Sequence, residues 1–147
     1  MRRLLRGVGT LLATAVLGAV LVQSAAAASP AQLSVTGKPR ALNSPYGGLV
    51  VETGVLATCP DGGLVCSGTA SISGSGAKKA STLASAPLNV SPGISQSVTL
   101  VLGKRGRKLL EDRGKLKIAV SVSVTGPDGQ PVTAANGGTI KQPKKHH

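Results

Sequence analysis

The chain has 147 residues and a mass of 14.5 kDa, a length typical of a single domain. Its Lys and Arg residues outnumber Asp and Glu by 17 to 5, and Tyr46 is the only Phe, Tyr or Trp. This composition excludes a platform of stacked aromatic rings for bases or sugars. It also argues against an enzyme, because titratable groups are scarce and the only histidines are His146 and His147, at the end of a basic tail.

Residues 1–28 have the pattern of an export signal peptide. Three arginines stand within the first six positions, an uncharged apolar run covers Gly7 to Val22, and Ala25 to Ala28 supply the small side chains that signal peptidase requires. A permanent membrane anchor is disfavoured, because the apolar run is short of the ~20 residues of a spanning helix. The pair Arg2-Arg3 also permits a twin-arginine signal, although the usual flanking residues are absent. We expect a secreted or envelope-associated protein without a membrane span after cleavage.

Residues 29–48 are predicted to form an N-terminal strand, Ala31 to Thr36, and a linker that ends in the turn-forming segment 43–48. The core domain is predicted over residues 49–141, beginning with an alternating strand from Leu49 to Cys59. A Pro-Asp-Gly-Gly turn follows, and a second strand continues from Cys66 to Ser73. We interpret these two strands as a hairpin.

Cys59 and Cys66 are the only cysteines, and the export signal assigns them to an oxidising compartment. The turn between them brings the sulfur atoms together, so the pair is predicted to form a disulfide. A zinc site is disfavoured because neither histidine nor further cysteine lies nearby to complete the ligand set.

The remaining elements alternate with turn signals. Weaker strands are predicted over Thr82 to Val90 and Val132 to Ile140, and a clear strand over Ser95 to Leu102. The clearest alternation runs from Lys115 to Thr125, with Leu116, Ile118 and the three valines at 120, 122 and 124 on one face. The only helical candidate is the connector Lys104 to Arg113, whose leucine pair caps the sandwich. The pattern predicts an all-β, Ig-like antiparallel β-sandwich of about seven strands with one short helical connector, followed by a basic tail over residues 142–147.

Two segments resemble secreted bacterial Ig-like or fibronectin-III-like modules: C-P-D-G-G-L-V-C-S-G-T-A-S-I, and the stretch from V-T-L-V-L-G-K-R-G-R-K-L-L to V-T-G-P-D-G-Q. The resemblance spans Val55 to Lys141. It departs from the usual D-x-x-G turn at Gly126 to Gly129. The resemblance implies the sandwich fold and a role as spacer or binding platform, and it implies no catalytic residues.

No residue pattern indicates catalysis, a cofactor or a metal site. The five acids lie on a strand, in two turns and as the adjacent pair Glu111-Asp112, so no two are predicted to face one cleft. The basic run after Gly103 lacks the order of a phosphate-binding loop. We interpret it as a solvated connector, or as a patch for an anionic cell-wall polymer. The candidate contacts are Lys104, Arg105, Arg107, Lys108 and Arg113, with the tail lysines as an extension.

The sequence therefore favours a secreted, non-catalytic structural or adhesion module, held at the envelope by ionic contacts. A partner is expected to be an anionic wall polymer or another extracellular protein. Nucleic acid is excluded by export from the cell. The alternative is a secreted inhibitor or ligand-binding protein that uses the Cys59–Cys66 loop, which the disulfide would pre-organise.

Overall fold

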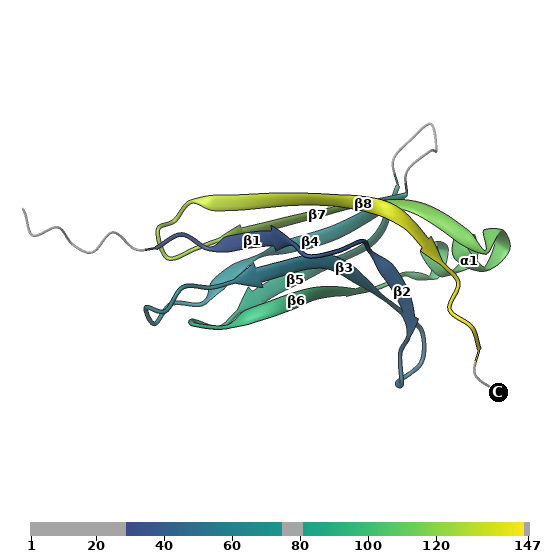
Figure 1. Ribbon diagram of the computed structural model, residues 1–147, viewed down its shortest axis with the longest axis horizontal. Helices are drawn as coiled ribbons and strands as arrows, with labels where there is room; N and C mark the ends of the chain where they lie inside the picture. Colours follow the sequence, from purple (N-terminus) through teal and green to yellow (C-terminus); the bar gives the residue numbers. More distant parts are fainter. Residues whose placement is uncertain (1–28, 75–80, 146–147) are drawn as a thin grey trace, which may run out of the picture.

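A computed structural model describes residues 29–74 and 81–145 (Figure 1). The predicted signal peptide and the two histidines lie outside these residues. The described residues form eight strands and one helix: β1 Gln32–Val35, β2 Arg40–Asn43, β3 Leu49–Thr58, β4 Cys66–Gly74, β5 Thr82–Val90, β6 Ser95–Val101, α1 Lys104–Arg113, β7 Lys115–Thr125 and β8 Pro131–Lys141.

The strands form two antiparallel sheets. The first contains β1, β2, β3 and β6, and the second has the order β5-β4-β7-β8. In the first sheet, Val51 of β3 pairs with Ala41 of β2 on one side and with Leu100 of β6 on the other. The chain is therefore an all-β sandwich, as predicted, and its arrangement is compatible with an Ig-like fold.

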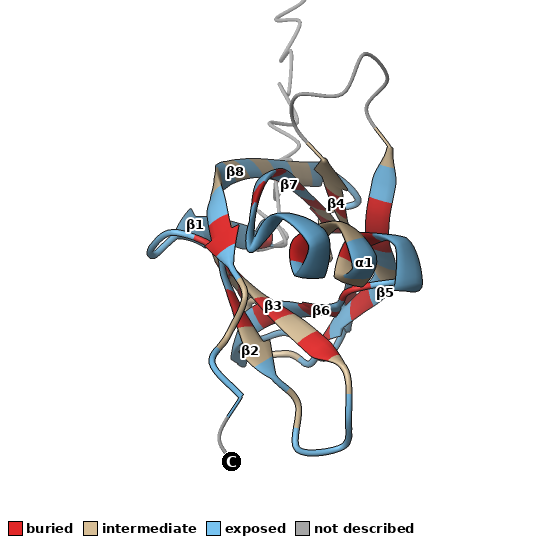
Figure 2. Cartoon of the chain, turned by 90° about the vertical axis from the view of Figure 1, so that its right-hand side faces the viewer, coloured by how far each residue is buried: buried red, intermediate tan, exposed pale blue. Residues whose placement is uncertain are grey.

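The core lies between the two sheets, and buried residues alternate with less buried ones most regularly along β3 and β7 (Figure 2). The face predicted for β7, with Leu116, Ile118 and the valines at 120, 122 and 124, is buried. The helix has its predicted bounds and covers one end of the sandwich. Leu110 is fully buried there and Leu109 packs against the core at its margin, so the leucine pair caps the sandwich as predicted.

The N-terminal segment contributes two strands, of which the sequence predicted only the first. Both pair with β3, β1 along its second half and β2 along its first. The strand β2 has only four residues and includes Arg40 and Asn43, so its side chains give no strand signal. Its conformation is stabilised by pairing with β3 rather than by local preference.

A polar network joins the sheets at a bulge in β3 between Glu52 and Leu56. Thr53 is fully buried, and its hydroxyl donates to the Val98 carbonyl at 2.7 Å. The Asn136 amide nitrogen on β8 donates to the carbonyls of Thr53 and Gly37, each at 2.8 Å. A side chain of the second sheet thus bonds one backbone carbonyl in the bulge, that of Thr53, and one in the segment between β1 and β2, that of Gly37.

Candidate functional site

The first turn of α1 is strongly positive. Gly103 precedes the helix without a side chain to cap it, and the first turn contains no acidic residue. Lys104 and Arg105 open the helix instead. Because the free N–H groups of a helix N-terminus already carry a partial positive charge, cations at this position add to it. Such an arrangement attracts anions at some cost to helix stability.

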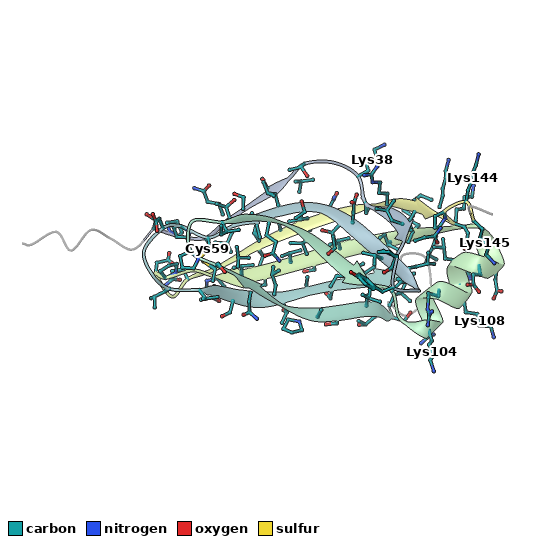
Figure 3. The ribbon with its side chains drawn as sticks, turned by 90° about the horizontal axis from the view of Figure 1, so that it is seen from below. Lys38, Cys59, Lys104, Lys108, Lys144 and Lys145 are labelled. Atoms are coloured by element: carbon teal, nitrogen blue, oxygen red, sulfur yellow. A yellow bond between two sulfur atoms is a disulfide. The ribbon has the colours of Figure 1, made fainter. Side chains whose placement is uncertain are left out.

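Four of the five predicted contact residues, Lys104, Arg105, Lys108 and Arg113, are exposed, and Figure 3 shows the two lysines extending from α1. Arg107 corrects the expectation that the whole basic run points to solvent. It is half-buried, its Nε lacks a hydrogen-bond partner, and its guanidinium lies near Gly48 in the turn before β3. The Arg107 side chain therefore lies against the sandwich. Its direction depends on how α1 packs, which the sequence of the basic run does not indicate.

The structure adds lysines from β7, β8 and the C-terminal segment to this end. Lys115 and Lys141 are register partners on adjacent strands. The segment after β8 is held in place, because Gln142 N–H donates to the Gly114 carbonyl at 2.9 Å and the Asn43 amide donates to the Lys144 carbonyl at 3.2 Å. The bond from Asn43 places Lys144 beside β2, at the same end of the molecule as α1, and Figure 3 shows Lys144 and Lys145 at that end.

We call the set of exposed cations on α1, at the β7–β8 margin and on the C-terminal segment the cationic end. Its members are Lys104, Arg105, Lys108, Arg113, Lys115, Lys141, Lys144 and Lys145. Across residues 29–74 and 81–145, the one ion pair joins Arg40 and Glu52 at 2.7 Å, outside this set. The cations of the cationic end are therefore not neutralised by ion pairs with described acids. Because like charges directly opposite on neighbouring strands repel, the pair of Lys115 and Lys141 is destabilising in the absence of an anion.

The opposite end of the sandwich, which we call the disulfide end, is built around Cys59 and Cys66. The disulfide is present as predicted, with the two Cα atoms 5.7 Å apart. The hairpin interpretation is wrong, because Cys66 begins β4 in the second sheet whereas Cys59 directly follows β3 in the first. The turn between them crosses from one sheet to the other, and strand alternation does not distinguish such a crossing from a hairpin.

Exposed aliphatic side chains lie at the disulfide end. Leu64 and Val65 of the disulfide loop are 59% and 55% exposed, and Ile94 of the neighbouring turn is 49% exposed. The two loops are tied together, since Cys59 N–H donates to the Ile94 carbonyl and Gly93 N–H donates to the Cys59 carbonyl, each at 3.0 Å. This end therefore presents a small apolar surface on a constrained backbone.

Positive charge is segregated along the long axis of the molecule, whereas three of the five acids, Glu52, Glu111 and Asp112, lie in the same half as the cations. Every described lysine and arginine lies in the half that carries α1, and Figure 3 shows the labelled lysines there and Cys59 at the far end. The disulfide end carries Asp61 and Asp128, both in turns as predicted. In the part of the chain that the structure describes, no three His, Cys, Asp or Glu residues are grouped so that they could hold a metal ion.

The chain matches no family model, no curated protein and no solved structure. Of the described segments, none is a helix long and apolar enough to cross a membrane. The disulfide is compatible with an extracellular location.

Proposed function

We propose that the protein is a secreted, non-catalytic Ig-like module that is held at the cell envelope by ionic contacts between its cationic end and an anionic polymer. The observation that carries this proposal is the segregation of charge: cations from α1, β7, β8 and the C-terminal segment meet at one end, whereas the opposite end holds only Asp61 and Asp128 among described charged residues.

The energetics of the cationic end support an anionic partner. An uncapped helix N-terminus carrying cations, and Lys115 opposite Lys141, are both arrangements that cost stability without a ligand. A polyanion placed over this end would remove the repulsion. Because these side chains are exposed, their contacts with a polymer would be screened over about 10 Å at 0.1 M salt, so binding should weaken steeply as salt rises.

The test measures the fraction of protein retained on purified cell wall as a function of salt concentration. The variant replaces Lys104, Arg105 and Lys108 by Ser and leaves the half-buried Arg107 in place, so that packing is preserved. We expect retention of the wild type to fall with salt, and the variant to be released at lower salt. Retention that is insensitive to salt, or equal for both proteins, would overturn the proposal.

Secretion is tested separately by the mass of the protein in the culture medium. Cleavage within the alanine run predicts a mature chain that begins at Ala28 or Ser29. A secreted protein that retains Met1 or Arg2 would contradict the signal-peptide part of the proposal.

A second candidate function is supported by the apolar surface at the disulfide end. Leu64 and Val65 are held exposed on a loop that the disulfide constrains, which lowers the entropic cost of binding. In this case the protein would bind or inhibit another extracellular protein. Replacing Leu64 and Val65 by Ser should then abolish recovery of that protein from culture medium. The control Val35→Ser removes an equally exposed valine from β1 and should leave recovery unchanged.

A further inference from the structure

The five outer strands of the sandwich, β1, β2, β5, β6 and β8, differ in how their free edges are protected. The short strands β1 and β2 are joined by a segment containing Lys38, and Arg40 begins β2. The edge strand β5 contains Pro87, and β8 begins with Pro131 and is bonded through Asn136 to the segment between β1 and β2. Proline, charge and covering segments are the usual devices that stop an edge from pairing.

The edge strand β6 contains none of these devices within its own residues, although directly after it the Gly103 N–H donates to the Leu83 carbonyl of β5 at 3.0 Å and so covers the end of that edge. Its seven residues, Ser95–Val101, include no proline, no glycine and no charged side chain. In the part of the chain that the structure describes, β6 pairs only with β3. The edge of β6 that faces away from β3 is therefore the least protected edge of the sandwich.

The backbone groups on that edge follow from the register. Beyond the two ends of β6, Leu102 N–H donates to the Leu49 carbonyl at 2.9 Å, and Cys59 N–H donates to the Ile94 carbonyl at 3.0 Å. In an antiparallel ladder, residues alternate between pointing their N–H and C=O groups toward the partner strand and away from it. The odd-numbered residues of β6 consequently direct their N–H and C=O groups away from β3. These residues are Ser95, Ser97, Thr99 and Val101, and all four side chains are exposed.

We propose that β6 pairs antiparallel with β6 of a second copy of this chain, so that two sandwiches share a continuous sheet. A two-fold axis at Val98 would place Ser97 opposite Thr99 of the second copy, and Ser95 opposite Val101 of the second copy. In this register, each residue of β6 whose N–H and C=O groups point away from β3 lies opposite another such residue of the second copy. The 69% exposed Val101 would then lie beside the Ile94–Ser95 segment of the second copy, where Ile94 is also exposed.

Charge complementarity favours a second copy as the occupant. The strand β6 runs from the disulfide end to the cationic end, so antiparallel pairing sets the cationic end of each copy alongside the disulfide end of the other. That end contributes Asp61 and no described cation. The two cationic ends would be separated by the length of the assembly, which minimises their repulsion.

Pairing would give the assembly two cationic ends that face in opposite directions. If the proposed function holds, each dimer could engage two polymer strands, or one strand twice, and its overall affinity would exceed that of one end. This consequence rests on the proposed function, whereas the dimer itself does not.

The test is sedimentation velocity of the chain from residue 29 onward, which contains every described element, over micromolar to near-millimolar concentrations. We expect a monomer–dimer equilibrium that persists or strengthens as salt rises, because salt screens both the attraction of a cationic end to Asp61 and the larger net repulsion between two cationic molecules. This salt response is opposite to that expected for polymer binding, so failure of one proposal is distinguishable from failure of the other.

Three variants locate the contact. Ser97→Pro removes an N–H that points away from β3 and should weaken dimerisation at least tenfold, as should Ser97→Lys. Ser85→Lys makes the same exposed substitution on the edge strand β5 and should leave the dimer unchanged. Thermal melts establish that each variant is folded. A wild type that stays monomeric throughout, or a dimer that folded Ser97 variants leave intact, would overturn the proposal.

Discussion

At the disulfide end a covalent bond joins the two sheets, whereas at the cationic end the chain passes from β6 of the first sheet to β7 of the second through α1, whose Leu110 is fully buried. The disulfide end has acidic turns and exposed aliphatic side chains, and the cationic end has exposed lysines and arginines. A rigid covalent closure requires few polar groups nearby. The helix, in contrast, has an exposed first turn with free N–H groups, and charged side chains lie on that turn. This difference indicates a structural role for the disulfide, whereas the polymer-binding role is proposed for the cationic end.

The largest expected effect tests how tightly strands pack toward the disulfide end. A Cβ atom on Gly68 of β4 would lie within van der Waals overlap of the Ser123 carbonyl on β7, which is backbone that side-chain rotation does not relieve. Gly68→Ala should therefore destabilise the fold by about 3 kcal/mol or more in denaturant unfolding. Gly62→Ala, at an open position of the same end, is the control. Equal stability of the two variants would show that the β4 and β7 backbones can move apart at Gly68 at little cost.

Removing the disulfide tests the covalent closure. The closed loop of eight residues limits the unfolded chain, so Cys59→Ala with Cys66→Ala should lower the free energy of unfolding by about 2.5 kcal/mol. Urea unfolding of the double variant against the oxidised wild type measures this difference. A variant as stable as the wild type would mean that the two sheets are held at this end by packing alone.

The Asn136 network tests whether the two ends unfold together. Asn136→Ala removes two hydrogen bonds that join β8 to backbone carbonyls near the bulge of β3, and should cost about 1–3 kcal/mol. Because the network lies between the ends, unfolding should remain a single transition when followed by amide hydrogen exchange. Separate loss of protection at one end would contradict a single cooperative unit.

The smallest effect is expected where the helix packs. A Cβ atom on Gly106 would approach the buried Leu102 side chain at 2.8 Å, so that side chain must shift, but no backbone atom stands in the way. Alanine also favours the helix by about 1 kcal/mol relative to glycine. Gly106→Ala should thus change the free energy of unfolding by about 1 kcal/mol or less. A loss as large as that of Gly68→Ala would show that the helical closure is as rigid as the strand packing.

Local patterns predicted most of the fold. The strand β7 and the helix α1 have their predicted bounds. Strict alternation indicates β7 and a charged segment ending at Gly114 indicates α1, and both signals depend only on residues close together in the sequence. The crossing between β3 and β4 was not predictable. Alternation shows which face of a strand is buried, but it does not show to which of the two sheets the strand belongs. The buried Thr53 depends on the distant Val98 carbonyl, and the half-buried Arg107 depends on its position beside Gly48.

Two variants of equal net charge test the central claim that the location of charge decides binding. One replaces Lys104, Arg105 and Lys108 by Ser; the other keeps these residues and introduces Ser67→Glu, Ser91→Glu and Gln130→Glu at exposed positions of the disulfide end. Retention on purified cell wall is measured for both as salt is raised. We expect the first variant to be released at clearly lower salt than the second. Release of both at the same salt concentration would show that net charge alone governs retention, and would contradict a binding role for the cationic end.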